Sequence, residues 1–312
     1  MAPIPRANLG DLTEWQKRVN DDTLLSKLSL PGTHNSAASH ISFPSVQCQG
    51  ASVTEQLEHG VRFLDIRCAV PFWTGCGGVF GSSPGDLQVI HGNFPVKIPF
   101  PEKLDSVLKE VYDFVGKHKS ESVVVSLKAE GAHKWEGDEF ADIIWSRYVH
   151  PNEEKWYLKN KIPRMGECRG KVILFRRFGC NDDSKKDNYG INAQWWKYNC
   201  DNDNRENVAV QDWCEVMKPE DINQKVTYIN DHIKRAVEFN STSEADSNGK
   251  LYINFCSGSN FWNPQCWPRN VSKGVFDGVT DKIDRGAGVI IIDYAETNQW
   301  DFVRSMVALN FD

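Results

Sequence analysis

The stretch Lys27-Leu28-Ser29-Leu30-Pro31-Gly32-Thr33-His34-Asn35-Ser36 joins a short apolar run to a group of polar residues. The run from Lys27 to Leu30 has the length of a buried strand, and the polar residues follow directly at its carboxyl end. Parallel strands that are covered on both faces are short and almost continuously apolar. This stretch therefore predicts one strand of a buried parallel sheet, with candidate functional groups at its carboxyl end.

Similar apolar runs recur along the whole chain, between amphipathic stretches. Eight of them are predicted as strands: Lys27 to Leu30, Arg62 to Arg67, Leu87 to Ile90, Val123 to Leu127, Lys171 to Phe175, Val208 to Gln211, Leu251 to Phe255 and Val289 to Ile292. A closed barrel of alternating strands and helices requires eight parallel strands. Helices are clearest from Pro219 to Glu238 and from Pro101 to Val115, whereas Pro71 to Asp86 and Gly179 to Asn207 are predicted as loops that replace helices. We predict an α/β fold, an irregular (β/α)8 TIM barrel.

The domain organisation predicted from the sequence is simple. A barrel of this type needs about 250 residues before insertions, and no repeat, linker or low-complexity segment divides the 312 residues. We expect residues 1–312 to form a single catalytic domain, with residues 1–22 as an extension packed on the barrel through Leu12, Trp15 and Val19.

Composition restricts the possible partners and compartments. A net charge of −6 argues against nucleic acid as a partner, and no obligate protein partner is evident, so we expect a monomer. The opening residues lack the apolar stretch of a signal peptide, and no run is long enough to span a membrane, which favours a cytoplasmic protein. Secretion is the alternative, because Cys68 and Cys76 are close enough in sequence for a disulfide and glycosylation sequons begin at Asn240 and Asn270.

Polar residues at the strand ends carry the functional prediction. In a TIM barrel the carboxyl ends of the strands form one face, where active sites lie. Seven of the eight predicted strands carry charged or imidazole groups at or near this end: His34, Asp65 with Arg67, His91, Lys128, Arg176 with Arg177, Asp212, and Asp293. Gathering so many ionisable groups in one place costs free energy unless a ligand or a function compensates. We therefore expect them to form one site.

Two histidines among cations suit one kind of chemistry. In the cleavage of a phosphodiester by a neighbouring hydroxyl, one imidazole takes the attacking proton and the other protonates the leaving oxygen. The pKa of an unperturbed imidazole, about 6.5, lets both forms coexist near neutral pH. Arg67 and Lys128 could stabilise the charge that develops on the phosphate. Asp293 could orient one of the two imidazoles.

Several motifs resemble one family. Leu30-Pro31-Gly32-Thr33-His34-Asn35-Ser36, Phe63-Leu64-Asp65-Ile66-Arg67 and His91-Gly92 resemble the X domain of phosphatidylinositol-specific phospholipases C, and later strands resemble its bacterial branch in the same order. The resemblance implies a phosphodiesterase (lyase) that cleaves phosphatidylinositol in membrane surfaces to diacylglycerol and inositol 1,2-cyclic phosphate. Glycosylphosphatidylinositol anchors are a further candidate substrate.

The resemblance also implies roles for individual residues. His34 would be the general base on the inositol 2-hydroxyl and hydrogen-bonded to Asp293, and His91 would be the general acid on the diacylglycerol oxygen. Arg67 would hold the phosphate beside its acidic neighbour Asp65. Three further residues match positions that contact the inositol ring: Lys128, Arg177 and Asp212.

This sequence departs from the bacterial pattern at two positions. Asn35 stands where that branch has Asp, and Cys214 stands where it has a Tyr that stacks on the inositol ring. Trp213, or the pair Trp195-Trp196, could supply the stacking instead. Calcium-dependent relatives carry Asn at position 35 as a metal ligand, so calcium is the main alternative to a reaction without cofactors. We expect neither cofactor nor metal, because Arg67 occupies the place of a calcium-binding carboxylate.

The resemblance further implies a shallow membrane contact. Phe261 and Trp262 lie in a polar loop after the seventh predicted strand, on the same face as the histidines, and Trp favours the headgroup region of a bilayer. We expect the loop to attach the protein peripherally to membranes, with Phe43 and Trp73 as further candidates.

Two other classes of protein stay open. A metal-dependent barrel phosphodiesterase of the glycerophosphodiester or sphingomyelinase D kind also uses two histidines, but it needs a set of carboxylates for magnesium, of which only Asp65 is evident. A phosphoinositide-headgroup-binding barrel without catalysis would keep the fold and lose the chemistry, and the presence of both histidines argues against it.

Overall fold

The computed structural model describes residues 9–40, 43–71, 85–279 and 282–311. Seven strands form a curved parallel sheet in the order β7-β5-β2-β1-β12-β11-β10. Their bounds are β1 (Ser29–Thr33), β2 (Phe63–Ala69), β5 (Val123–Ala129), β7 (Val172–Arg177), β10 (Val208–Asp212), β11 (Leu251–Phe255) and β12 (Gly288–Ile292). Each coincides with a predicted apolar run, and the α/β TIM-barrel class is confirmed.

The barrel is open on one side. In the described residues β7 and β10 do not pair with each other, because β10 pairs with the antiparallel β9 (Cys200–Asn204) and β7 pairs with β6 (Trp156–Tyr157) and β8 (Ile191–Asn192). The segment between β7 and β10 is polar, as expected for the predicted loop. It forms only the short strands β8 and β9, and neither closes the barrel by pairing with both β7 and β10.

The predicted third strand is part of a hairpin and not a member of the parallel sheet. The run Leu87 to Ile90 forms β3 (Gln88–His91), which runs antiparallel to the end of β2 and pairs with β4 (Phe94–Pro95). An apolar run predicts burial but not strand direction, so the sequence pattern could not distinguish the two arrangements. The hairpin still places His91 at the carboxyl end of the sheet.

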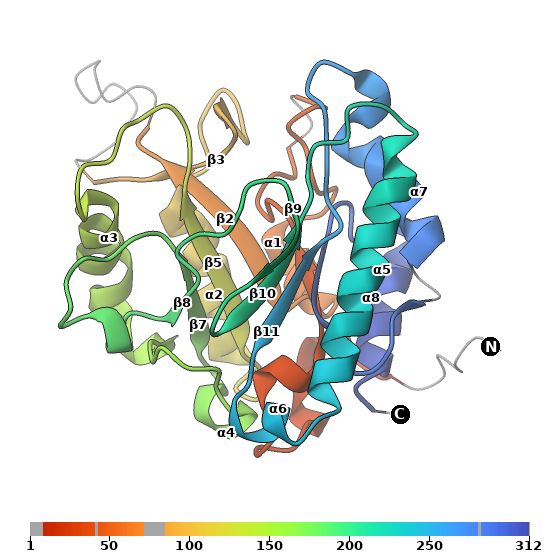
Figure 1. The fold of residues 1–312 in the computed structure, drawn as a ribbon. Helices are drawn as coiled ribbons and strands as arrows, with labels where there is room; N and C mark the ends of the chain where they lie inside the picture. Colours follow the sequence, from red (N-terminus) through yellow and green to blue (C-terminus); the bar gives the residue numbers. More distant parts are fainter. Residues whose placement is uncertain (1–8, 41–42, 72–84, 280–281, 312) are drawn as a thin grey trace.

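Helices cover the outer face of the sheet (Figure 1). They are α1 (Val53–Glu58), α2 (Leu104–Lys117), α3 (Glu139–Ile143), α4 (Met165–Cys168), α5 (Asp221–Asn240), α6 (Glu244–Ser247), α7 (Pro268–Val279) and α8 (Thr297–Ala308). The two clearest predicted helices correspond to α2 and α5. Side chains that alternate along each strand divide between this outer core, which includes Leu64 and Ile290, and an inner core, which includes Phe63 and Ile291.

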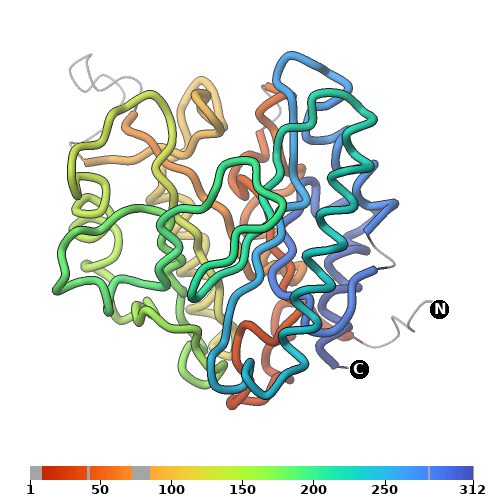
Figure 2. The backbone as a smooth tube through the Cα atoms, in the orientation of Figure 1, coloured from red at the N-terminus to blue at the C-terminus, as the bar shows by residue number. Residues whose placement is uncertain are grey.

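The N-terminal segment closes the amino end of the barrel. Leu12–Arg18 forms a 3-10 helix, and Leu12, Trp15 and Val19 are buried in the same cluster as Leu30 and Phe63 of the inner core. The Trp15 indole also donates a hydrogen bond to the Gly60 carbonyl (3.0 Å). In Figure 2 this red segment lies beneath the strands, at the end away from the carboxyl termini of the sheet.

Several observations bear on the compartment. Cys68 is a buried free thiol, and Cys76 lies outside the described residues, as do Trp73 and most of the predicted loop from Pro71 to Asp86. The Asn240 amide is buried and donates hydrogen bonds to the Ser26 and Gly286 carbonyls, so this sequon offers no accessible nitrogen for glycosylation. Among the described helices, none is long and apolar enough to cross a membrane.

Candidate active site

The carboxyl ends of five strands bring most of the predicted polar residues to one face. Arg176 is an exception, because it donates to the carbonyls of Phe178 and Tyr189 and does not join the others. His34 follows β1, Asp65 and Arg67 belong to β2, Lys128 to β5 and Arg177 to β7, and Asp293 follows β12. In Figure 1 these ends lie in the upper part of the sheet, on the side of β3. His91 is the last residue of β3. The contacts below show that these residues form a connected cluster.

His34 is held on both sides. Its Nδ1 lies 2.8 Å from Asp293 Oδ1, and its Nε2 lies 2.9 Å from the side-chain nitrogen of Asn35. A carboxylate accepts hydrogen bonds, so the proton belongs on Nδ1 and the lone pair on Nε2. The Gln49 amide donates to the carbonyls of His34 and Ile292 and so links the ends of β1 and β12. This link fixes the position of His34 relative to Asp293. His34 is thus oriented to act as a base through Nε2.

Asn35 turns the chain directly after His34. Its φ of 41° lies in the left-handed region, which Asn tolerates better than most residues. Its backbone N–H donates to Asp65 Oδ2 at 3.4 Å, and its side-chain amide faces His34. Asn35 therefore contacts the candidate base, at the position where the bacterial pattern has Asp.

His91 has a different environment. Its Nδ1 donates to the Val46 carbonyl (2.9 Å), and the sulfur of Cys48 lies 3.5 Å from the same nitrogen. The rings of His34 and His91 are perpendicular, at 88°, with their centroids 5.5 Å apart. Burial lowers the pKa of His91 to about 4, and the nearby Arg67 guanidinium acts in the same direction. In the free protein His91 is therefore neutral at neutral pH.

Asp65 is the anion at the centre of the cluster. It is completely buried, and its two oxygens accept hydrogen bonds from Arg67 Nε (3.1 Å) and Arg177 Nη1 (3.0 Å). Burial alone would raise the pKa of Asp65, but the two guanidinium groups outweigh it and hold the pKa well below its usual range. Asp65 thus stays ionised and orients both arginines.

Glu130 also belongs to the cluster, although it was not predicted. Its carboxylate lies 3.3 Å from Arg67 and 3.7 Å from Lys128, and it accepts a hydrogen bond from the Gly92 N–H. Burial opposes its ionisation, but Arg67 and Lys128 lower its pKa. The sequence held one signal for it, since Glu130 follows Lys128 by two residues and so lies on the same side of an extended chain.

The ring of Trp196 packs against Arg177. The guanidinium of Arg177 lies 3.8 Å above the Trp196 ring, and the Trp196 indole donates to Asp212 Oδ2 at 2.9 Å. Of the aromatic residues considered from the sequence, Trp196 therefore contacts this cluster. The ring of Trp213 contacts Tyr228 of α5 instead. The buried Lys225 donates to the Trp213 carbonyl and to the Gln211 side chain.

The predicted membrane-contact residues lie in the loop between β11 and α7. Trp262 is 87% exposed and Phe261 is 40% exposed. Phe261 stacks on Phe94 of β4, with centroids 5.2 Å apart, and Phe94 contacts Phe43. The exposed loop is therefore connected through aromatic contacts to the hairpin that carries His91.

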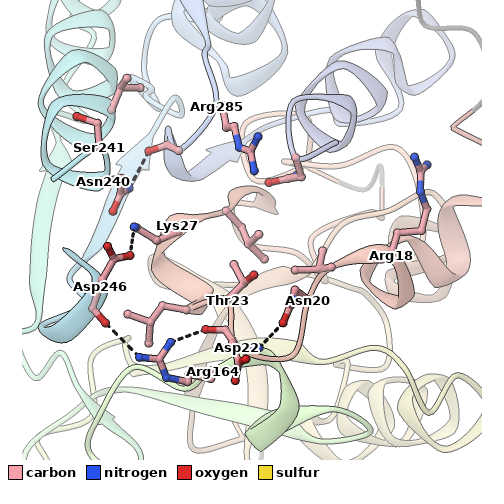
Figure 3. Close-up of a pocket in the computed structure, with 16 residues that line it drawn as sticks. Arg18, Asn20, Asp22, Thr23, Lys27, Arg164, Asn240, Ser241, Asp246 and Arg285 are labelled. Atoms are coloured by element: carbon pink, nitrogen blue, oxygen red, sulfur yellow. Dashed lines mark hydrogen bonds and ion pairs between the residues drawn. The ribbon is translucent and has the colours of Figure 1, made fainter. Parts of the chain in front are cut away.

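A cavity of about 680 Å³ lies elsewhere, at the amino ends of the strands (Figure 3). Arg18, Lys27, Arg164 and Arg285 line it together with Asp22 and Asp246. Lys27 pairs with Asp246, and Arg164 donates to the carbonyls of Asp22 and Asp246. Because this is the end of the barrel opposite the histidines, the cavity is separate from the candidate site.

The fold is a TIM barrel, and the connected cluster lies at the carboxyl ends of its strands. Residues 28–178 match the family model described as phosphatidylinositol-specific phospholipase C, X domain. The predicted resemblance is thereby confirmed, and the chain is similar to phosphatidylinositol-specific phospholipases C of the bacterial type.

Individual relatives agree with this result. The 1-phosphatidylinositol phosphodiesterase of Listeria monocytogenes is 24% identical, over 94% of this chain and 84% of the relative, and the enzyme of that name from Staphylococcus aureus strain Newman is 22% identical, over 90% and 88%. Among solved structures, a variant of the Staphylococcus aureus phosphatidylinositol-specific phospholipase C has a TM-score of 0.77 at 20% identity, covering 95% of this chain and 97% of the other. The Listeria monocytogenes enzyme has a TM-score of 0.68 at 20% identity, covering 97% and 100%.

Proposed function

We propose that this chain cleaves phosphatidylinositol to diacylglycerol and inositol 1,2-cyclic phosphate. The observation that carries the proposal is the pair of perpendicular imidazoles with different environments, His34 on a carboxylate and His91 on a carbonyl, beside the arginine of an ion-pair cluster. The similarity to proteins named 1-phosphatidylinositol phosphodiesterase supports the choice of lipid. The alternative of a non-catalytic headgroup-binding barrel gives this pair no use. The alternative of a metal-dependent glycerophosphodiester phosphodiesterase needs carboxylates for magnesium, whereas Asp65 and Glu130 are paired with arginines.

The proposed reaction begins at His34. Its Nε2 accepts the proton of the inositol 2-hydroxyl as that oxygen forms a bond to phosphorus, and Asp293 stabilises the imidazolium that results. The bond from phosphorus to the diacylglycerol oxygen breaks, and the protonated His91 supplies a proton to that oxygen. The negative phosphate of the bound lipid favours protonation of His91, which offsets the low pKa of this group in the free protein.

Arg67 is the proposed phosphate-binding group. Asp65 and Glu130 hold its guanidinium from two sides, so its position is fixed before the lipid arrives. A preorganised cation stabilises the charge that develops on phosphorus without a cost of reorganisation in the transition state. The inositol ring is proposed to lie against Lys128, Arg177 and Asp212, with Trp196 as the aromatic neighbour.

We infer that the reaction needs no metal. Calcium takes six to eight oxygen ligands, several of them carboxylate oxygens. Here Asp65 and Glu130, the carboxylates beside Asn35 and Arg67, are occupied by guanidinium groups. A fixed arginine can provide the electrostatic stabilisation for which calcium-dependent relatives use the ion.

The protein is proposed to act as a single-domain monomer at the surface of a membrane. The exposed Trp262 and its neighbour Phe261 would insert into the headgroup region, on the face of the barrel to which the histidines open. No charge pattern on the chain favours nucleic acid as a partner.

The experiment is incubation with phosphatidylinositol vesicles in excess chelator, following water-soluble inositol phosphate. We expect release to continue in chelator, and expect His34→Ala and His91→Ala each to lose several powers of ten in rate, since an acid or base typically contributes about 10²–10⁴-fold. The double variant should lose little more, because the two groups act as one unit. Activity that vanishes in chelator and returns only with calcium would contradict the role of Arg67.

A further inference from the structure

Cys48 is a thiol beside both histidines that the proposed reaction does not use. One ligand atom each of His34, Cys48 and His91 lies within 4.8 Å of the others. Cys48 is completely buried, and its backbone is fixed by a hydrogen bond from its N–H to the Ala38 carbonyl and another from the Tyr294 N–H to its own carbonyl. The backbone that carries the sulfur is therefore fixed beside the two imidazoles.

We propose that His34, Cys48 and His91 bind one zinc-like divalent ion, and that this ion reversibly blocks lipid cleavage. The blocking effect rests on the proposed function, because it follows from the use of both imidazoles as metal ligands. A ring nitrogen that coordinates an ion can neither accept nor donate the proton that the reaction requires. The binding itself rests only on the arrangement of the three side chains.

The ligand set selects the class of ion. Two imidazole nitrogens and a thiolate suit zinc and similar soft or borderline ions, whereas calcium and magnesium require oxygen ligands. Three protein ligands also leave a fourth tetrahedral position for water. Zinc bond lengths place neighbouring ligand atoms roughly 3.3–3.7 Å apart. Because the three ligand atoms lie within 4.8 Å of one another, they have to approach by at most about 1.5 Å.

The surroundings of His34 favour coordination. Asp293 holds Nδ1 at 2.8 Å and leaves Nε2 for the ion, which is the carboxylate–histidine arrangement that commonly supports bound metal. The Asn35 amide now faces Nε2 and would have to move aside. Such a rotation involves a side chain and leaves the backbone of the site unchanged.

The local charge permits a cation. Arg67 is a positive charge that acts on Cys48 and would repel a cation, but Asp65 and Glu130 pair with it directly. Burial raises the pKa of the Cys48 thiol, with a further contribution from Asp293, so the free protein keeps the proton on sulfur. Binding releases that proton, and the thiolate and Asp293 together then neutralise the two charges of the ion.

The first test measures inhibition with the full chain. After treatment with chelator and dialysis, initial rates of phosphatidylinositol cleavage are measured across a series of buffered zinc concentrations, and each protein is compared with its own zinc-free rate. We expect zinc to inhibit the natural protein, and chelator to restore the rate. Cys48→Ser should need at least about tenfold more zinc, whereas Cys168→Ser, which alters a buried thiol of α4, should respond like the natural protein.

The second test does not depend on activity. Cobalt(II) replaces zinc in such sites, and a cobalt–thiolate bond gives a charge-transfer absorption band in the near ultraviolet. We expect one equivalent of cobalt to produce the band in the natural protein and in Cys168→Ser, but not in Cys48→Ser. Absence of the band in the natural protein, or equal zinc inhibition of Cys48→Ser, would overturn the ion site and leave lipid cleavage standing. A band in a protein that cleaves no lipid would support the ion site and reject the proposed function.

Discussion

His91 and His232 are both held as neutral imidazoles, and this makes stability depend on pH. Burial is the main cause for both, and it lowers the pKa of His91 to about 4 and that of His232 to about 3. In the unfolded chain each imidazole has a pKa of about 6.5. Between these values the unfolded state binds more protons than the folded state. The contribution of the two neutral imidazoles to the free energy of unfolding is therefore fully present above about pH 6.5, and it is lost as the pH falls towards 4.

We therefore expect the free energy of unfolding, measured with urea, to be lower at pH 5 than at pH 7. His91→Gln should show a smaller decrease over the same interval, because one of the two imidazoles with a lowered pKa is gone. An equal decrease in the variant would mean that His91 is protonated as easily in the folded protein as in the unfolded chain.

The predicted residues and the missed ones differ in how the sequence displays them. His34, Asp65, Arg67, Lys128 and Arg177 end or follow apolar runs, and the parallel strands carry them to one face. Cys48 reaches His91 through a loop, and Trp196 reaches Arg177 through the segment between β8 and β9, so their positions depend on loop conformations that no periodic pattern encodes. Glu130 directly follows β5 and could have been predicted, because it is two residues after Lys128 and so lies on the same side of an extended chain.

At the scale of elements, a buried ion pair joins the N-terminal segment to the barrel. Arg62, before β2, and Glu121, before β5, are both completely buried, with Nη2 and Oε2 2.8 Å apart. Arg62 also donates to the carbonyls of Leu12 and Thr13, and Glu121 accepts from the Gln16 N–H. The 3-10 helix therefore depends on both charges.

Glu121→Gln should lower the free energy of unfolding by about 3–5 kcal/mol, because it leaves the Arg62 guanidinium buried without its counter-charge. The matched control is Lys109→Ala, which breaks the exposed pair with Asp113 on the surface of α2 and should cost at most about 1 kcal/mol. Urea titration of both variants at pH 7 measures the difference. Similar losses in the two variants would show that burial adds nothing to the Arg62–Glu121 pair.

The sequence predicted elements better than their connections. All seven strands of the parallel sheet, together with α2 and α5, follow from apolar runs and amphipathic spacing. The direction of β3 and the opening between β7 and β10 do not follow from such patterns. They depend on which strands pair with each other in the folded chain. These two irregularities lie next to the site, and one of them positions His91.

At the scale of the whole molecule, the carboxyl face of the barrel combines the histidines with an exposed aromatic loop. Trp262→Ala should weaken binding to phosphatidylinositol vesicles roughly tenfold or more, since burial of a large apolar side chain contributes about 1.5–3 kcal/mol. Trp262→Phe, which keeps an aromatic ring, should retain most of the binding. Sedimentation with vesicles measures both, and unchanged binding of Trp262→Ala would remove this loop from the membrane contact.

The central claim is that the attacking oxygen belongs to the substrate and that His34 and His91 move the two protons. A phosphorus NMR time course of phosphatidylinositol cleavage in mixed micelles tests this most directly, because the five-membered cyclic inositol phosphate has its own resonance. We predict that the cyclic species appears before any acyclic inositol phosphate, and that His91→Ala slows its appearance by several powers of ten. Acyclic product with no cyclic species at any time, or a near-normal rate for His91→Ala, would contradict the mechanism.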